Sequence, residues 1–119
     1  MSTSIQRIDT NARMSHIVVY GGVAYLAGAI ASDLTADFNV QMQQTLAEIE
    51  ASLARVGSDK TRMLSAQIWL KNLERDFPAM NEAWEAWVPK GHAPSRATCE
   101  ASMAAPEVLV EIIVTAAVG

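Results

Sequence analysis

The run of residues 108–117 constrains the fold of this chain most. It reads Val-Leu-Val-Glu-Ile-Ile-Val-Thr-Ala-Ala, and its one charged side chain is Glu111. The run is far shorter than the roughly 20 apolar residues of a membrane span, and its β-branched residues are typical of a strand buried on both faces. Alternation places one set of apolar side chains on each face: Val108, Val110, Ile112 and Val114 on one, and Leu109, Ile113 and Ala117 on the other.

The N-terminal half contains a hairpin signal and a helix signal. Residues 17–20 and 23–27 are β-branched and aromatic, and the Gly21-Gly22 pair between them predicts a tight hairpin. The alternating residues 5–8 predict a further edge strand before it. An amphipathic helix is predicted over residues 37–56, where apolar side chains recur every three or four positions and Gly57 supplies the stop.

The C-terminal half continues the alternation of strands and helices. A largely apolar strand is predicted over residues 63–70 and a second helix from near Asp76, with Pro78 in its first turn. That helix is expected to bury Phe77, Met80, Trp84, Trp87 and Val88 and to end at Pro89, Lys90 and Gly91. Two extended runs follow, residues 96–103 and 108–117.

This order of elements predicts an α+β fold, with both helices packed on one face of a mixed sheet. A chain of 119 residues fits one core, so residues 1–119 are expected to form a single domain. The predicted elements include nothing that would cover the second face of the terminal strand. A second copy of the same chain is the economical cover, which predicts a homo-oligomer.

Charge and composition exclude several classes of partner. The net charge is -4, and no basic run attracts a polyanion, so nucleic acid is not expected as a partner. Cys99 is the only cysteine, which excludes an internal disulfide and fits a reducing compartment. The polar start (residues 1–11) does not resemble a secretory signal, and a cytoplasmic protein without a membrane partner is the expectation.

Metal, phosphate and thiol chemistry have little support in the sequence. His16 and His92 are far apart and lack ligand spacing, so no metal site is predicted. No helix or lysine follows the Gly21-Gly22 pair, which is therefore interpreted as a turn and not as a phosphate loop. Strand alternation groups Cys99 with Ala97, Ala101 and Met103, which predicts a buried, unreactive thiol. The three tryptophans, Trp69, Trp84 and Trp87, are expected in the core.

Two charged residues stand out from this background. Arg96 opens a strand after the Pro94-Ser95 turn, and a guanidinium fixed there is suited to bidentate recognition of a carboxylate. The alternative is a solvated edge arginine or a salt bridge at a subunit contact, and composition alone favours this alternative. Glu111 lies within the most hydrophobic strand, where burial requires a partner or ordered water and raises its pKa. It is either a structural partner or a residue that orients water.

Three segments resemble the Rid (reactive intermediate deaminase) family, also called the YjgF family, over nearly the whole chain. They are residues 23–28 (Val-Ala-Tyr-Leu-Ala-Gly), residues 81–87 (Asn-Glu-Ala-Trp-Glu-Ala-Trp), and residues 93–98 (Ala-Pro-Ser-Arg-Ala-Thr) followed by Val110-Glu111-Ile112. The Pro-x-Arg turn followed by a carboxylate in the terminal strand is the closest match. The resemblance implies a homotrimer in which each subunit packs two helices on a six-stranded mixed sheet, with small clefts at the subunit contacts.

The resemblance also implies cofactor-free hydrolysis of 2-imino acids to 2-oxo acids and ammonia. In that scheme Arg96 clamps the substrate carboxylate and Glu111 positions the attacking water. Ala27, Gly28, Ala97 and Thr98 would contact the substrate. An imine hydrolyses readily once protonated, so orientation and one placed water are sufficient and no strong nucleophile is needed.

The sequence departs from the family pattern at several positions. Many members carry Ser-Gly-Gln where this chain has Ala27-Gly28-Ala29, and many have Cys at the position of Thr98. They also have a Tyr near the segment occupied here by Met14-Ser15. A divergent subfamily is therefore predicted, and a non-catalytic module that binds 2-oxo acids is the alternative. A ribonuclease, a description that some members carry, is disfavoured by the acidic charge and the lack of a paired histidine site.

Overall fold

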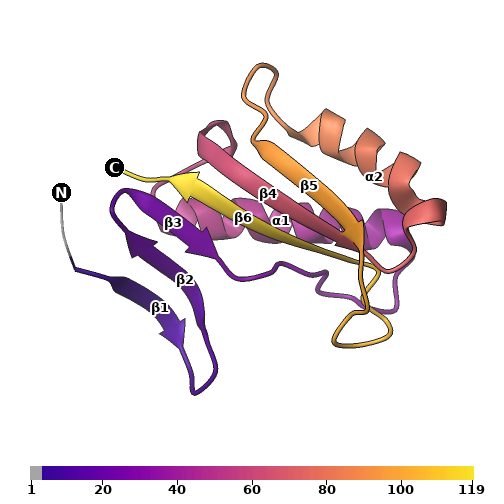
Figure 1. Ribbon diagram of the computed structural model, residues 1–119, viewed down its shortest axis with the longest axis horizontal. Helices are drawn as coiled ribbons and strands as arrows, with labels where there is room; N and C mark the ends of the chain where they lie inside the picture. Colours follow the sequence, from indigo (N-terminus) through magenta and orange to yellow (C-terminus); the bar gives the residue numbers. More distant parts are fainter. Residues whose placement is uncertain (1–3) are drawn as a thin grey trace.

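The computed structural model describes residues 4–119, which form six strands and two α-helices (Figure 1). In chain order the elements are β1 (Gln6–Thr10), β2 (Ser15–Tyr20), β3 (Val23–Leu26), α1 (Phe38–Arg55), the short 3-10 helix Lys60–Arg62, β4 (Met63–Leu70), α2 (Leu73–Trp87), β5 (Ser95–Glu100) and β6 (Val110–Ala117). The strands lie in the order β1-β2-β3-β6-β4-β5, and only β4 and β5 are parallel. The predicted α+β class and six-stranded mixed sheet are confirmed.

Strand β6 lies in the middle of the sheet, between β3 and β4, as its apolar composition predicts. Val110, Ile112, Val114 and Ala116 are at most 1% exposed and belong to the core that includes the apolar stripe of α1. The residues between them, Glu111, Ile113, Thr115 and Ala117, are only half-buried. The helices therefore cover one face of the sheet. We call the other the open face.

The two short N-terminal connections follow local sequence signals. Gly21 and Gly22 both have positive φ, 61° and 80°, as a tight two-residue hairpin turn requires. Strand β1 pairs with β2 at the sheet edge, which confirms the predicted extra strand. Helix α1 begins after Asp37, whose carboxylate accepts a hydrogen bond from Val40 N, and Gly57 (φ 71°) ends its last turn.

Helix α2 begins at Leu73, earlier than the predicted start near Asp76. The cap is Asn72, whose side chain accepts from Arg75 N, and the carboxylate of Glu100 on β5 accepts from Leu73 N. Pro78 consequently lies inside the helix and not in its first turn. Met80 and Trp84 are buried as predicted, but the prediction for Phe77 is wrong, because its ring is 39% exposed beside β5.

Strand β5 is an edge strand and ends at Glu100, short of the predicted Met103. Its parallel register with β4 pairs Arg96 and Thr98 with the buried Ala66 and Ile68, so Arg96 and Thr98 lie on the helix-covered side. The alternate residues, Ala97 and Cys99, pair with Gln67 and Trp69 on the open face.

Two burial predictions for this part of the sheet are therefore wrong. Cys99 is exposed, because nothing in the described chain covers its face of the edge strand. Trp69 is half-buried on the open face and is not in the core. The described helices include none long and apolar enough to cross a membrane.

Candidate functional site

The carboxylate of Glu111 lies on the open face, against the segment that leaves β3. Ala29 bridges to Ile112 through two backbone hydrogen bonds, Ala29 N to Ile112 O (2.8 Å) and Ile112 N to Ala29 O (3.0 Å), and this bridge brings Gly28 beside Glu111. A β-carbon at position 28 would lie only 2.9 Å from Glu111 Cδ. A glycine is therefore required at position 28 for Glu111 to keep this position.

Partial burial raises the pKa of Glu111 above its ordinary value, and desolvation is the cause. Within residues 4–119, no hydrogen-bond donor or cation is paired with this carboxylate. The predicted direction of the pKa shift is thus confirmed. A half-desolvated carboxylate without a protein partner is suited to hold a water molecule and to accept its proton.

Arg96 lies near the start of β5, which is anchored by a hydrogen bond from Ser95 Oγ to Leu64 O (3.2 Å). Its Nη1 lies 3.8 Å from the sulfur of Met80 on α2. No carboxylate of the described chain pairs with it. The guanidinium therefore keeps its capacity to bind an external carboxylate through two parallel hydrogen bonds.

Arg96 and Glu111 do not meet within one chain. They lie on opposite faces of the sheet, and β4 separates their strands. Of the other predicted contact residues, Gly28 adjoins Glu111, while Ala97 lies on the open face of β5. The N–H of Ala27 is already donated to His16 O (2.9 Å).

Thr98 shares the helix-covered side with Arg96. Its hydroxyl oxygen is the single buried side-chain nitrogen or oxygen that lacks a hydrogen-bond partner among the described residues.

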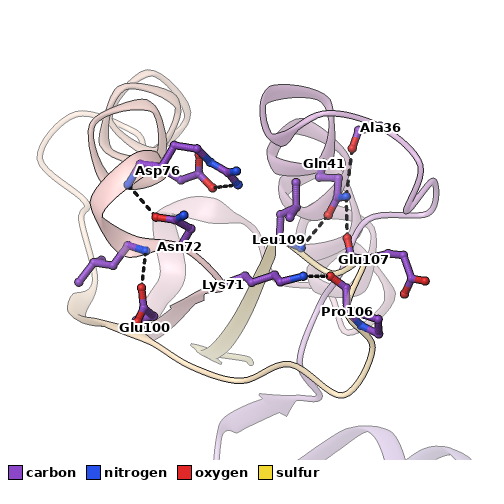
Figure 2. A network of polar contacts seen from close by, with 11 residues as sticks. Ala36, Gln41, Lys71, Asn72, Asp76, Glu100, Pro106, Glu107 and Leu109 are labelled. Carbon is purple, nitrogen blue, oxygen red and sulfur yellow. Dashed lines mark hydrogen bonds and ion pairs between the residues drawn. The ribbon is translucent and has the colours of Figure 1, made fainter.

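Gln41 on α1 is a functional candidate that the sequence reasoning missed. It is fully buried, and its Nε2 donates to the carbonyls of Ala36 (3.1 Å) and Glu107 (3.0 Å), while Leu109 N donates to its Oε1 (3.0 Å). Figure 2 shows this amide between the segment that follows Gly28 and the segment that precedes Glu111. The sequence feature that could have indicated Gln41 is its place directly before Met42, a residue of the apolar stripe of the helix.

Lys71 adds a second tie to the same loop, with Nζ donating to Pro106 O and its backbone N donating to Leu109 O (3.1 Å) (Figure 2). Together, Gln41 and Lys71 fix the loop that leads into β6. The position of Glu111 therefore depends on hydrogen bonds made outside its own strand.

His16, Glu48 and Ser52 have the composition of a catalytic triad but not its geometry. Ser52 Oγ (3.0 Å) and Glu48 Oε1 (3.4 Å) both approach the same imidazole nitrogen, Nε2. A triad histidine uses one nitrogen for the nucleophile and the other for the acid, and Ser52 is also 3% exposed. Among residues 4–119, no three His, Cys, Asp or Glu side chains form a metal-binding cluster.

Comparisons with known proteins agree over almost the whole chain. The sequence model of the family described as Endoribonuclease L-PSP matches residues 4–118. A RutC family protein of Haemophilus ducreyi is 44% identical over 114 residues, which cover 96% of this chain and 97% of that protein. The RutC family protein YoaB of Escherichia coli is 44% identical over 115 residues, with 97% and 99% covered. The solved structure of a YjgF family member from Neisseria meningitidis superposes with a TM-score of 0.91 at 36% identity, covering 98% of this chain and 97% of that one.

Proposed function

This chain belongs to the Endoribonuclease L-PSP family, which includes the RutC, YjgF and Rid proteins, and on that premise we propose that it hydrolyses 2-imino acids to 2-oxo acids and ammonia. The observation that carries the proposal is the pair of unpartnered charges. A guanidinium without a carboxylate near the start of β5 can hold the substrate, and a desolvated carboxylate against Gly28 can hold the water.

We propose that the functional unit is a homotrimer. Arg96 and Glu111 lie on opposite faces of one sheet, so one chain cannot bring both to a small substrate. If the open face of one copy packs beside β5 and α2 of the next, Glu111 of the first faces Arg96 of the second. That packing would also cover the half-buried apolar residues of the open face, such as Ile113 and Trp69.

The mechanism requires few groups. Arg96 holds the carboxylate, which fixes the imine carbon, and Glu111 accepts a proton from water as the new C–O bond forms on the protonated imine. The product of this step is a tetrahedral carbinolamine. Glu111 then returns the proton to the nitrogen. As the C–N bond breaks and ammonia leaves, the hydroxyl proton of the carbinolamine passes back to the Glu111 carboxylate and the C=O bond of the 2-oxo acid forms. A carboxylate with a raised pKa suits both the acceptance and the return of that proton.

A non-catalytic module that binds 2-oxo acids is the second candidate. It is favoured by Ala27 and Ala29, which offer no side-chain hydroxyl or amide beside Gly28. Ribonuclease activity has less support, because the net charge of -4 disfavours a polyanionic substrate.

The deciding experiment follows the loss of 2-iminobutanoate generated in situ by a dehydratase. The protein is expected to accelerate this loss over buffer, and Arg96→Ala and Glu111→Gln are each expected to lower the acceleration by about 100-fold or more. Glu85→Gln, at an exposed position on α2, is the matched control and should behave as the parent protein. Absence of any acceleration by folded protein would exclude the hydrolase, and binding of a 2-oxo acid that is lost in Arg96→Ala would then favour the binding module.

A further inference from the structure

A groove of about 550 Å³ runs between the first half of α2 and β5. Its walls are formed by Leu73, Glu74, Phe77, Pro78, Thr98 and Glu100. We call it the α2–β5 groove. Phe77, which lines it, is 39% exposed, although most large apolar residues of the described chain are covered. An aromatic ring left open beside a concavity provides a contact surface for another apolar group.

The α2–β5 groove adjoins the proposed carboxylate clamp. Thr98 and Arg96 point to the same side of β5 and are two residues apart, which places their α-carbons about 7 Å from each other. On α2, Phe77 precedes Met80, the neighbour of the Arg96 guanidinium, by one helical turn. A molecule whose carboxylate rests on Arg96 can therefore extend along β5 to Phe77.

The chemistry of the walls selects among possible occupants. Leu73, Phe77 and Pro78 are apolar, and the hydroxyl oxygen of Thr98 is buried and therefore not offered to an occupant. Glu100 uses one oxygen to accept from Leu73 N, and Figure 2 shows it there beside Asn72 at the start of α2. The side chains of the groove thus expose no hydrogen-bond donor, and its two carboxylates repel an acidic group.

We infer that the α2–β5 groove binds the side chain of the substrate and that the protein prefers 2-imino acids with a branched or aromatic apolar side chain. This inference rests on the proposed function and adds the substrate class to it. A methyl side chain would leave the groove largely unfilled, whereas a leucine-derived or phenylalanine-derived side chain reaches further along β5 toward Phe77. Filling an apolar site of this kind is worth 10-fold or more in kcat/KM.

The test compares imines that an amino-acid oxidase generates from alanine, leucine, phenylalanine and glutamate, with kcat/KM measured for each. The leucine and phenylalanine imines are expected to exceed the alanine imine by about 10-fold or more, with the glutamate imine poorest. In Phe77→Ala the leucine-to-alanine ratio should fall about 10-fold, and in Phe77→Leu it should fall less. Val40→Ala, at an exposed position on α1, is the control and should keep the parent ratio.

The outcomes separate the groove from the proposed function. Equal kcat/KM values for all four imines, or a ratio that Phe77→Ala does not change, would overturn the inference and leave the hydrolase intact. If no imine is hydrolysed, the proposed function fails, and the groove is judged by binding alone. In that case 4-methyl-2-oxopentanoate must bind more tightly than pyruvate and lose this advantage in Phe77→Ala, and equal affinities overturn the inference.

Discussion

The side chain of Glu111 packs directly against Gly28 and fills the space that a side chain at position 28 would need. A β-carbon at position 28 would lie 2.9 Å from Glu111 Cδ and 3.1 Å from its Cγ. We predict that Gly28→Ala displaces the Glu111 carboxylate, because the end of a side chain moves more easily than the backbone. Imine hydrolysis should fall about 100-fold, as expected when a catalytic group is misplaced by about 1 Å. Circular dichroism should show an unchanged fold. Full activity in Gly28→Ala would indicate that Glu111 has no role in positioning water.

Glu111→Gln should lower activity but raise stability at neutral pH. Burial raises the pKa of Glu111, so the folded state binds its proton more tightly than the unfolded state does. The stability contributed by the protonated carboxyl is complete below its ordinary pKa and is lost as the pH rises through the raised pKa. Denaturant unfolding should therefore show Glu111→Gln and the parent nearly equal at low pH, with the variant increasingly more stable as the pH rises. Glu85→Gln should show no such trend.

The sequence predicted those elements whose signals are local. The Gly21-Gly22 turn, the apolar stripe of α1 and the two-sided apolar run of β6 each predicted the observed structure within a few residues. The start of α2 was missed, because Glu100 from a distant strand supports the cap at Asn72. A pattern of neighbouring residues does not reveal that a residue on another strand, here Glu100, accepts a hydrogen bond from the first turn of the helix.

For the edge strand β5, the sequence predicted which side chains share a face but not which of the two faces is buried. The sequence correctly separated Arg96 and Thr98 from Ala97 and Cys99, but it assigned the covered face to the wrong pair. Alternation states which residues share a face and not which face the helices cover. For the candidate site, Arg96 and Glu111 stood out as charges in unusual places. The proximity of Gly28 to Glu111 depends on a long-range bridge that no spacing in the sequence predicts.

Gln41 should contribute strongly to stability, because its amide joins α1 to the segment just before the helix and to the distant loop that leads into β6. In Gln41→Leu, Leu109 N and the carbonyls of Ala36 and Glu107 lose their partner in a buried environment. We expect a loss of about 2–4 kcal/mol in the free energy of unfolding, measured with urea. Gln43→Leu, at an exposed position on the same helix, is the matched control and should change stability by about 0.5 kcal/mol or less. Equal effects of the two substitutions would show that the Gln41 network carries little energy.

Subunit mixing tests whether each site combines two copies of the chain. Arg96→Ala and Glu111→Gln are each expected to be inactive alone, because each variant lacks one of the two charged side chains of the proposed site. These two side chains lie on opposite faces of the sheet in one chain. After the two variants are unfolded together and refolded in equal amounts, some contacts place an intact Arg96 opposite an intact Glu111. Random assembly makes this about a quarter of the sites in a cyclic oligomer, so about a quarter of the parent activity should return. A site contained within one chain would recover none, since every chain in the mixture carries one defect.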